Sequence, residues 1–184
     1  FETAFTGVMK TVDESAKTSY KDLEEGIKKL STTTASSKEE IAAVMEAAGQ
    51  LGVPTDDILK FTETMIKMGD TTNVSAEEAA VALAKFTNVT GDGTANVDKL
   101  GASIVALGNN FATDERSIIE MSQRLAAAGK ISGLTSTDIL ALAASMSSVG
   151  IEAEAGGTAM SQTLTQISKA VAEPGEKLNK LAQI

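Results

Sequence analysis

The sequence predicts an all-α protein, and three observations support this fold class. Apolar residues recur at three- and four-residue steps along most of the chain, which is the spacing of one helix face. Helix-capping residues stand where many of these segments begin, and glycines stand where many of them end. No segment shows sustained apolar–polar alternation rich in β-branched or aromatic residues, so a sheet is not expected. We expect a compact multi-helix bundle of about nine short helices, with an internal duplication and an N-terminal helical arm.

The composition narrows the function classes. The 184-residue chain has a net charge of −9, 3% aromatic residues and no Trp. Small and aliphatic side chains must therefore fill the core, and an acidic chain lacks the basic surface that specific nucleic-acid binding requires. Cys and His are absent, which excludes disulfides, typical zinc sites and Ser-His-Asp or Cys-His catalysis within this sequence. No apolar run approaches the ~20 residues of a membrane span, so no transmembrane segment is expected.

Residues 1–36 are predicted to form a helical arm outside the compact body. Apolar residues recur from Phe5 to Leu30 over a helix at 1–30, in a narrow seam like the edge of a coiled coil. Clustered hydroxyl residues then end the helix, because their side chains compete for backbone hydrogen bonds. An ordinary surface helix packed on the body is an equal alternative. The chain begins without an initiator Met or a signal-peptide pattern, and we expect it to be part of a longer protein.

Two helices are predicted between residues 37 and 69. Ser37 and Glu40 form a capping box, with Ser as the N-cap and Glu three residues on, and glycines near residue 50 mark the end of this helix. Thr55 is predicted to cap the next helix, where acidic residues follow at the positive N-terminus. Gly69 ends that helix.

The next two helices differ in character. Ser75 and Glu78 form a second capping box, which opens an Ala-rich helix that a neighbour can approach closely. A Gly-Asp-Gly turn follows at 91–93. The helix over 96–111 has the cleanest apolar period in the chain, and glycines within it suggest close helix contacts.

Four further helices complete the prediction. One opens near Thr113, another is capped by Thr135 or Ser136, a third follows a Gly-Gly pair at 156–157, and Pro174 suits the first turn of a last one. From residue 37 onward, the side chains expected to face inward are Ile41, Val44, Met45, Ala48, Leu51, Ile58, Thr62, Met65, Ile66, Ala79, Ala80, Leu83, Ala84, Phe86, Val97, Leu100, Ile104, Leu107, Phe111, Ile118, Met121, Leu125, Ala128, Ile139, Leu142, Ala143, Met146, Val149, Met160, Leu164, Ile167, Val171, Leu178 and Leu181.

Two stretches of the chain are similar to each other. GVPTDDILKFTETMIKMG at 52–69 and GLTSTDILALAASMSSVG at 133–150 share both flanking glycines and an in-register Asp-Ile-Leu. Self-similarity of this kind predicts a duplicated structural unit. We expect pseudo-repeats near 37–90 and 113–172 within an all-α core at 37–184, joined by the helix at 96–111.

Three motifs are candidate sites. Asp92, Thr94, Asn96 and Asp98 alternate oxygens as a calcium loop does, but the Gly and the closing Glu of that loop are missing, which favours a turn. The segment at 129–133 lacks the spacing of a phosphate loop and does not follow a strand, so it is interpreted as a helix end.

The third motif is a pair of carboxylates, Glu152 and Glu154. Such a pair can serve as acid and base in a glycosidase, but acidic residues are common at helix starts and the chain is poor in sugar-stacking aromatics. The methionines on inward faces are interpreted as core residues, namely Met45, Met65, Met121, Met146 and Met160. We predict no catalytic residue, cofactor-binding residue or metal ligand, no cofactor, and no enzymatic activity.

Several long strings resemble the core region of phage tail tape measure proteins. They are LGASIVALGNNFAT at 100–113, MSQRLAAAG at 121–129 and, most strongly, SSVGIEAEAGGTA at 147–159, and the strings at 75–80 and 86–91 also fit. The resemblance spans about residues 37–180 and is loose over 1–36.

This resemblance implies a virion protein of a long-tailed phage or prophage. Such proteins are made in the bacterial cytoplasm, lie in the lumen of the tail tube, set its length and help to deliver DNA. The implied partners are the tail tube protein, tail assembly chaperones, tail-tip proteins and further copies of the protein. Two alternatives from other classes stay open: a peptidoglycan-cleaving enzyme and a membrane-active helical module carried by a phage tail protein.

Overall fold

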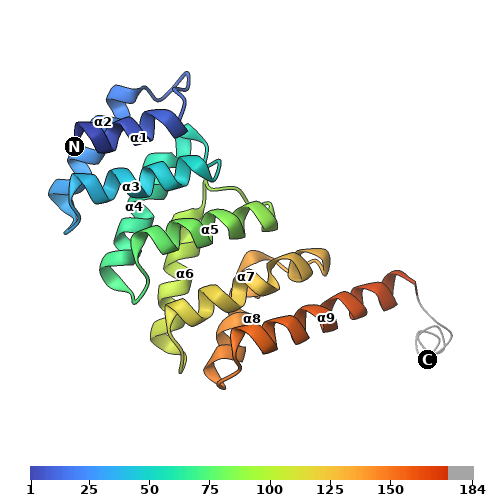
Figure 1. Cartoon of the computed structure of the whole chain (residues 1–184). Helices are drawn as coiled ribbons and strands as arrows, with labels where there is room; N and C mark the ends of the chain where they lie inside the picture. The colour runs from blue at the N-terminus through green and yellow to red at the C-terminus, as the bar shows by residue number, and fades with distance from the viewer. Residues whose placement is uncertain (174–184) are drawn as a thin grey trace.

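The computed structural model describes residues 1–173, and these residues form nine α-helices and no strand (Figure 1). The all-α prediction is therefore confirmed. A last helix predicted after Pro174 lies outside the described residues. The helices are α1 (Glu2–Thr11), α2 (Tyr20–Thr33), α3 (Lys38–Gln50), α4 (Thr55–Thr71), α5 (Ala76–Thr90), α6 (Val97–Asn110), α7 (Glu115–Ile131), α8 (Ser136–Ser148) and α9 (Ala153–Ala172).

The helices stack in two layers. The odd-numbered helices pack side by side in the order α1, α3, α5, α7, α9, and they all run in the same direction (Figure 1). The even-numbered helices return between them and form a second layer in the order α2, α4, α6, α8. Every substantial helix–helix contact in residues 1–173 joins helices no more than two positions apart along the chain. This nearest-neighbour arrangement is typical of an α-solenoid.

Three of the predicted capping residues cap their helices in the structure. The hydroxyls of Ser37, Ser75 and Thr135 each accept a hydrogen bond from the backbone N–H three residues on, and a carboxylate completes each capping box. The prediction for Thr55 is wrong. Thr55 is the first helical residue of α4, and its hydroxyl donates to the backbone carbonyl of Asp13 at 2.7 Å.

The helix predicted over residues 1–30 is the main correction to the expected elements. The single helix expected over 1–30 is two helices, because a loop at 12–19 separates α1 from α2. Ser19 opens α2 through a capping box with Asp22, a signal that the sequence prediction overlooked. Helix α1 packs on α3, and α2 packs on α3 and α4. Val8 and Leu23 are fully buried by these contacts.

Most of the predicted inward residues of α3, α4, α5 and α7 are buried in one continuous hydrophobic core. The exceptions lie on α6 and at the end of the stack. Leu100 and Leu107 are half-buried, and Phe111 is 43% exposed because it follows the last turn of α6. At the end of the stack, Val149 is 73% exposed and Val171 is 67% exposed, so their predicted burial is wrong within the described chain. Ile167 is also exposed there.

The two similar stretches begin with the same turn. The N–H of Val53 donates to the carbonyl of Ala48 at 3.1 Å, and the N–H of Leu134 donates to the carbonyl of Gly129 at 2.9 Å. In both turns a glycine with φ near +80° precedes the donor, as a Schellman motif requires. Helix pairs α3–α4 and α7–α8 are thus joined alike. The division of the chain into an arm, a core and two pseudo-repeats stays a prediction.

Candidate functional site

The oxygens of the calcium-like loop are engaged by neighbouring helices. Asp92 accepts a hydrogen bond from the hydroxyl of Ser136, and the hydroxyl of Thr94 donates to Asp57 at 3.0 Å. Asp98 forms an ion pair with Lys60 at 2.9 Å. The loop therefore ties α6 and its preceding turn to α4 and α8. Within residues 1–173, no group of three or more His, Cys, Asp or Glu side chains is placed to hold a metal ion.

The other two weighed motifs form helix ends. The segment at 129–133 is the C-terminal turn of α7, as interpreted from the sequence, and Gly133 has a φ of 81°. Glu152 is the N-cap residue of α9 and Glu154 lies in its first turn, and both side chains are exposed. Acidic residues are common at such helix starts, where they face the positive end of the helix dipole.

The methionines behave largely as predicted. Met45, Met65 and Met121 are fully buried and Met146 is 7% exposed, while Met160 is half-buried where α9 packs on the core. They fill space between helices, in keeping with the flexible thioether side chain.

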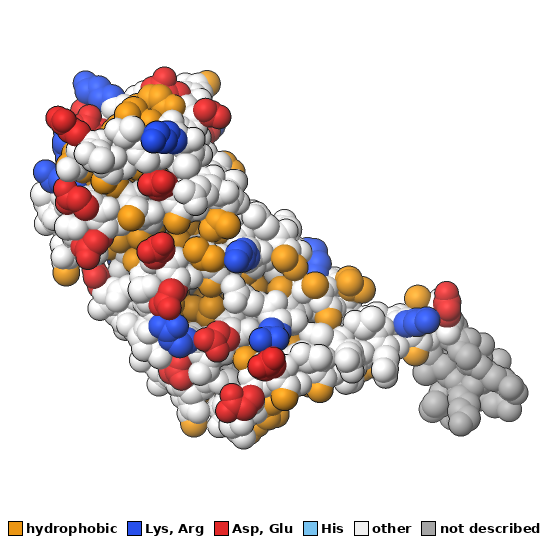
Figure 2. Space-filling view, viewed as in Figure 1, with side chains coloured by type: hydrophobic (Ala, Val, Ile, Leu, Met, Phe, Trp, Pro, Cys, Tyr) orange, Lys and Arg blue, Asp and Glu red, His pale blue; other side chains and the backbone are white. Residues whose placement is uncertain are grey.

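One edge of the described chain is lined by acidic side chains, and we call it the acidic edge. Because the odd-numbered helices are parallel, their N-termini lie along one edge of the stack, and acidic side chains gather there (Figure 2). The residues that form this acidic edge are Glu2, Glu39, Glu40, Glu77, Glu78, Asp114, Glu115, Glu152 and Glu154. Each helix N-terminus carries a partial positive charge, which stabilises the carboxylates beside it. Such an edge repels phosphates and can pair with basic side chains of a protein partner.

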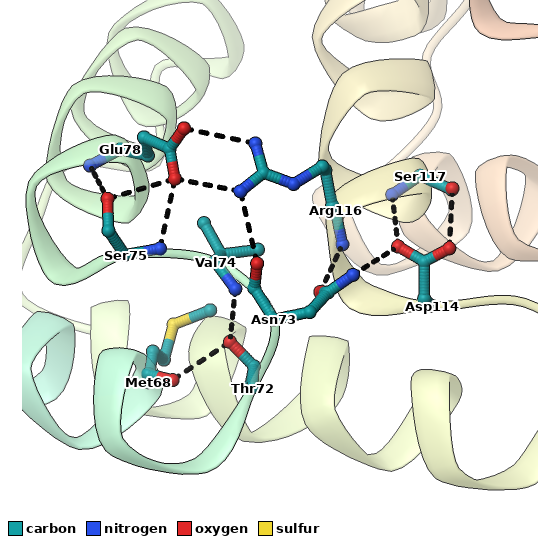
Figure 3. Close-up of polar contacts among 9 residues, drawn as sticks. All are labelled: Met68, Thr72, Asn73, Val74, Ser75, Glu78, Asp114, Arg116 and Ser117. Carbon is teal, nitrogen blue, oxygen red and sulfur yellow. Dashed lines mark hydrogen bonds and ion pairs between the residues drawn. The ribbon is translucent and has the colours of Figure 1, made fainter.

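One arginine on this edge connects the start of α7 to the start of α5 (Figure 3). Arg116, in the first turn of α7, donates to both carboxylate oxygens of Glu78 at 3.0 and 2.9 Å and to the backbone carbonyl of Asn73 at 3.0 Å. The amide of Asn73 in turn donates to Asp114, the N-cap of α7, at 2.9 Å. The turn that joins α4 to α5 is thereby fastened to the start of α7, so the network links the first predicted pseudo-repeat to the second.

These hydrogen bonds favour the ionised form of the Glu78 and Asp114 carboxyl groups. Hydrogen bonds from the Arg116 guanidinium lower the pKa of Glu78 to about 2, and hydrogen bonds from the backbone and hydroxyl of Ser75 add to this. Burial works against ionisation of Asp114, but hydrogen bonds from Asn73 and Ser117 outweigh it and lower the pKa. The pKa of Arg116 is raised, chiefly by its hydrogen bonds to Glu78. Sequence reasoning missed this network, because residues 78 and 116 lie far apart along the chain and no local motif joins them.

Two grooves flank α4 on the other layer. One lies between α4 and α6 with a volume of about 420 Å³, and the other lies between α2 and α4 with a volume of about 570 Å³. Lys60, Glu63 and Lys67 line both grooves. Their charges are engaged locally, since Lys67 pairs with Glu63 at 2.6 Å and Lys60 pairs with Asp98.

Comparison with known proteins decides the family. A family model described as "Phage-related minor tail protein" matches residues 24–183, which is most of the chain. The chain belongs to this family. No curated protein and no solved structure matches the chain significantly. Membership in the phage-related minor tail protein family makes the chain a structural component of a phage tail and thus of the virion.

The fold agrees with a structural role in this family. Its described surface features are helix-to-helix ties, an acidic edge and the two grooves beside α4. No helix in residues 1–173 is long and apolar enough to cross a membrane. The candidate functional site of this minor tail protein is therefore its acidic edge, with the Arg116 bridge at its centre.

Proposed function

We propose that this chain is a segment of the tail tape measure protein of a long-tailed phage or prophage. The match to the phage-related minor tail protein family over residues 24–183 carries the proposal. The strings at 100–113, 121–129 and 147–159 add the finer resemblance to tape measure proteins. In this role the protein occupies the tail tube lumen and assists DNA delivery.

Within that protein, this segment acts as an assembly or docking module, and longer helices elsewhere set the tail length. A single continuous helix of this length would extend roughly 280 Å, at ~1.5 Å per residue. The chain instead turns back after each helix, and its longest described helix, α9, has 20 residues. A folded stack of this kind presents surfaces to partners, but it adds little to the length of a tape measure protein.

The partners in this proposal are the tail tube protein, tail assembly chaperones, tail-tip proteins and further copies of the chain. The acidic edge offers carboxylates to basic side chains on such partners. The net charge of −9 also disfavours binding to DNA, which must pass along the tube without being retained.

An in-frame deletion of residues 37–184 from the tail gene tests the proposal. Electron micrographs of the mutant should show either no tails or tails of nearly unchanged length, because an assembly module has been lost and the ruler has not. Intact tails shortened by roughly 220 Å, the length of 148 residues in a continuous helix, would mean that this segment is itself the ruler.

Two further assays address the remaining alternatives. The purified chain should release no soluble fragments from bacterial cell walls and no dye from liposomes. Release in the first assay would indicate a peptidoglycan-cleaving enzyme, and release in the second would indicate a membrane-active module.

A further inference from the structure

Three large apolar side chains are exposed on two neighbouring turns of the acidic edge. Phe111 lies in the turn between α6 and α7, and Val149 and Ile151 lie in the turn between α8 and α9. The hydroxyls of Thr113 and Ser147 share a hydrogen bond that joins the two turns. The three apolar side chains therefore lie at one end of the acidic edge, and we call them the apolar corner.

The exposure of Ile151 differs from that of the corresponding residues in the other turns of the same kind. The N–H of Ile151 donates to the carbonyl of Met146 at 3.2 Å, and a glycine with a φ of 78° precedes it, so this turn is a Schellman motif like those after α3 and α7. The apolar residue at this position frequently packs against the helix that the turn ends. Val53 is accordingly 6% exposed and Leu134 is half-buried, whereas Ile151 is 41% exposed.

Ile151 is nevertheless held in place by α9. Its Cγ2 methyl group occupies the space that a Cβ atom of residue 156 would need, so the glycine at this position lets the side chain lie against the helix. The Cε methyl group of Met146 lies 3.4 Å from the same point. A side chain that is positioned in advance loses little conformational entropy on binding, which favours its use as a contact for a partner.

Carboxylates flank the apolar corner, and Figure 2 shows acidic and hydrophobic side chains together near the starts of α7 and α9. Glu152 and Glu154 are exposed at the start of α9. The carboxylate of Glu115 lies against Gly108, in the last turn of α6 before Phe111. Within residues 1–173, none of these three glutamates forms an ion pair. The charge beside the apolar corner is therefore complementary to a partner that carries basic side chains next to an apolar one.

We propose that the apolar corner binds a basic amphipathic segment of another tail protein. An apolar side chain of that segment packs on Phe111, Val149 and Ile151, and its Lys or Arg side chains pair with the three glutamates. The same carboxylates repel nucleic acids and anionic membranes, so the partner is a protein. Helix α9 carries the described chain roughly 30 Å away from this corner over its 20 residues, and a second molecule supplies the segment in this proposal.

This inference rests on the proposed function of the chain as a docking module. It names the part of the acidic edge at which a partner binds and the chemistry of that partner. The exposed area is smaller than the ~800 Å² per partner of a stable interface, so each contact is weak and reversible.

Fluorescence anisotropy with a labelled synthetic peptide tests the proposal. The probe is a helical peptide with leucines on one face and lysines on the other. In one control peptide serines replace the leucines, and in a second control peptide glutamates replace the lysines. The chain should bind the probe roughly tenfold more tightly than either control, because the corner offers both apolar contacts and carboxylates.

Two sets of variants locate the binding site. Phe111→Ser combined with Ile151→Ser should weaken binding of the probe several-fold and change the unfolding temperature little, because both side chains are exposed. Glu152→Gln combined with Glu154→Gln should also weaken binding. The matched control is Glu2→Gln with Glu77→Gln, which removes two exposed carboxylates elsewhere on the acidic edge and should leave the affinity nearly unchanged.

The proposal is overturned if the two pairs of glutamate variants lose equal affinity, since binding would then reflect general charge attraction. Undiminished binding by the Phe111→Ser and Ile151→Ser variant, or equal binding of the leucine and serine peptides, would also overturn it. So would sedimentation showing that the chain associates with itself through these residues. Any of these results would leave the proposed function standing, because the in-frame deletion tests that role separately.

Discussion

The guanidinium of Arg116 donates hydrogen bonds to both carboxylate oxygens of Glu78, and it thereby joins the first turn of α7 to the first turn of α5. Paired hydrogen bonds of this kind require the planar fork of arginine. The same guanidinium donates to the backbone carbonyl of Asn73, so one side chain joins the starts of two parallel helices and the turn between α4 and α5.

Arg116→Lys should lower the urea concentration at the midpoint of unfolding. Lysine keeps the positive charge but cannot make the bidentate contact to Glu78 and reach Asn73 as well. The matched control is Arg124→Lys, because Arg124 is an exposed arginine in the middle of α7. Equal midpoints for the two variants would show that the bridge contributes nothing to stability.

Stability should fall as the pH drops from about 4.5 to about 2. The pKa of Glu78 is about 2 in the folded chain, against an ordinary value of 4.5. A carboxyl group whose pKa is lowered by folding stabilises the folded state above its ordinary pKa, and it loses this contribution as it is protonated. In Glu78→Gln, the decrease in unfolding temperature over this pH range should be smaller than in the unmodified chain. An identical decrease in both proteins would mean that other carboxyl groups cause the acid sensitivity.

Thr62→Val should stabilise the fold by about 1 kcal/mol. Thr62 is fully buried in α4, and among the described residues its hydroxyl has no hydrogen-bond partner. Valine has the same shape and removes the unpaired polar group. The control is Thr87→Val, which should destabilise the fold, because the buried hydroxyl of Thr87 donates to the carbonyl of Leu83 at 2.9 Å. Chemical denaturation that gives both changes the same sign would contradict this account.

Ile104→Ala should destabilise the chain by about 2–5 kcal/mol, because Ile104 is fully buried at the centre of α6. Leu107→Ala should cost less than Ile104→Ala, because Leu107 is only half-buried. Both residues lie on the same predicted apolar stripe. A smaller loss of stability for Leu107→Ala would therefore show that the burial of each side chain, and not its position in the stripe, determines the cost. Denaturation curves with the opposite order would show that α6 is rotated from its described position.

Local signals in the sequence predicted the helices well. Ser37 with Glu40 and Ser75 with Glu78 act as capping boxes because the N-cap hydroxyl and the carboxylate three residues on lie within one helical turn. The break between α1 and α2 is less evident from the sequence, because Asp22 stands where a capping box usually has Glu or Gln. Local patterns of this kind need no knowledge of the packed structure.

Features that depend on packing were predicted less well. The apolar stripe of α6 was identified, but periodicity does not reveal which part of a stripe a neighbour covers, and Phe111 is exposed beyond the last turn. The acidic edge follows from the parallel direction of the odd-numbered helices, which emerges only once the layers are assembled. The bridge from Arg116 to Glu78 depends on that same assembly.

The nearest-neighbour packing of the stack also determines how the chain folds and opens. Because the substantial contacts of each described helix are with helices one or two positions away, the contact order of the described chain is low, and such chains fold quickly. Opening begins most easily at α9, which packs mainly on α7 and has Gly157 as its only fully enclosed residue. Amide protons of α9 should therefore exchange with solvent before those of α4 and α5 in the middle of the stack.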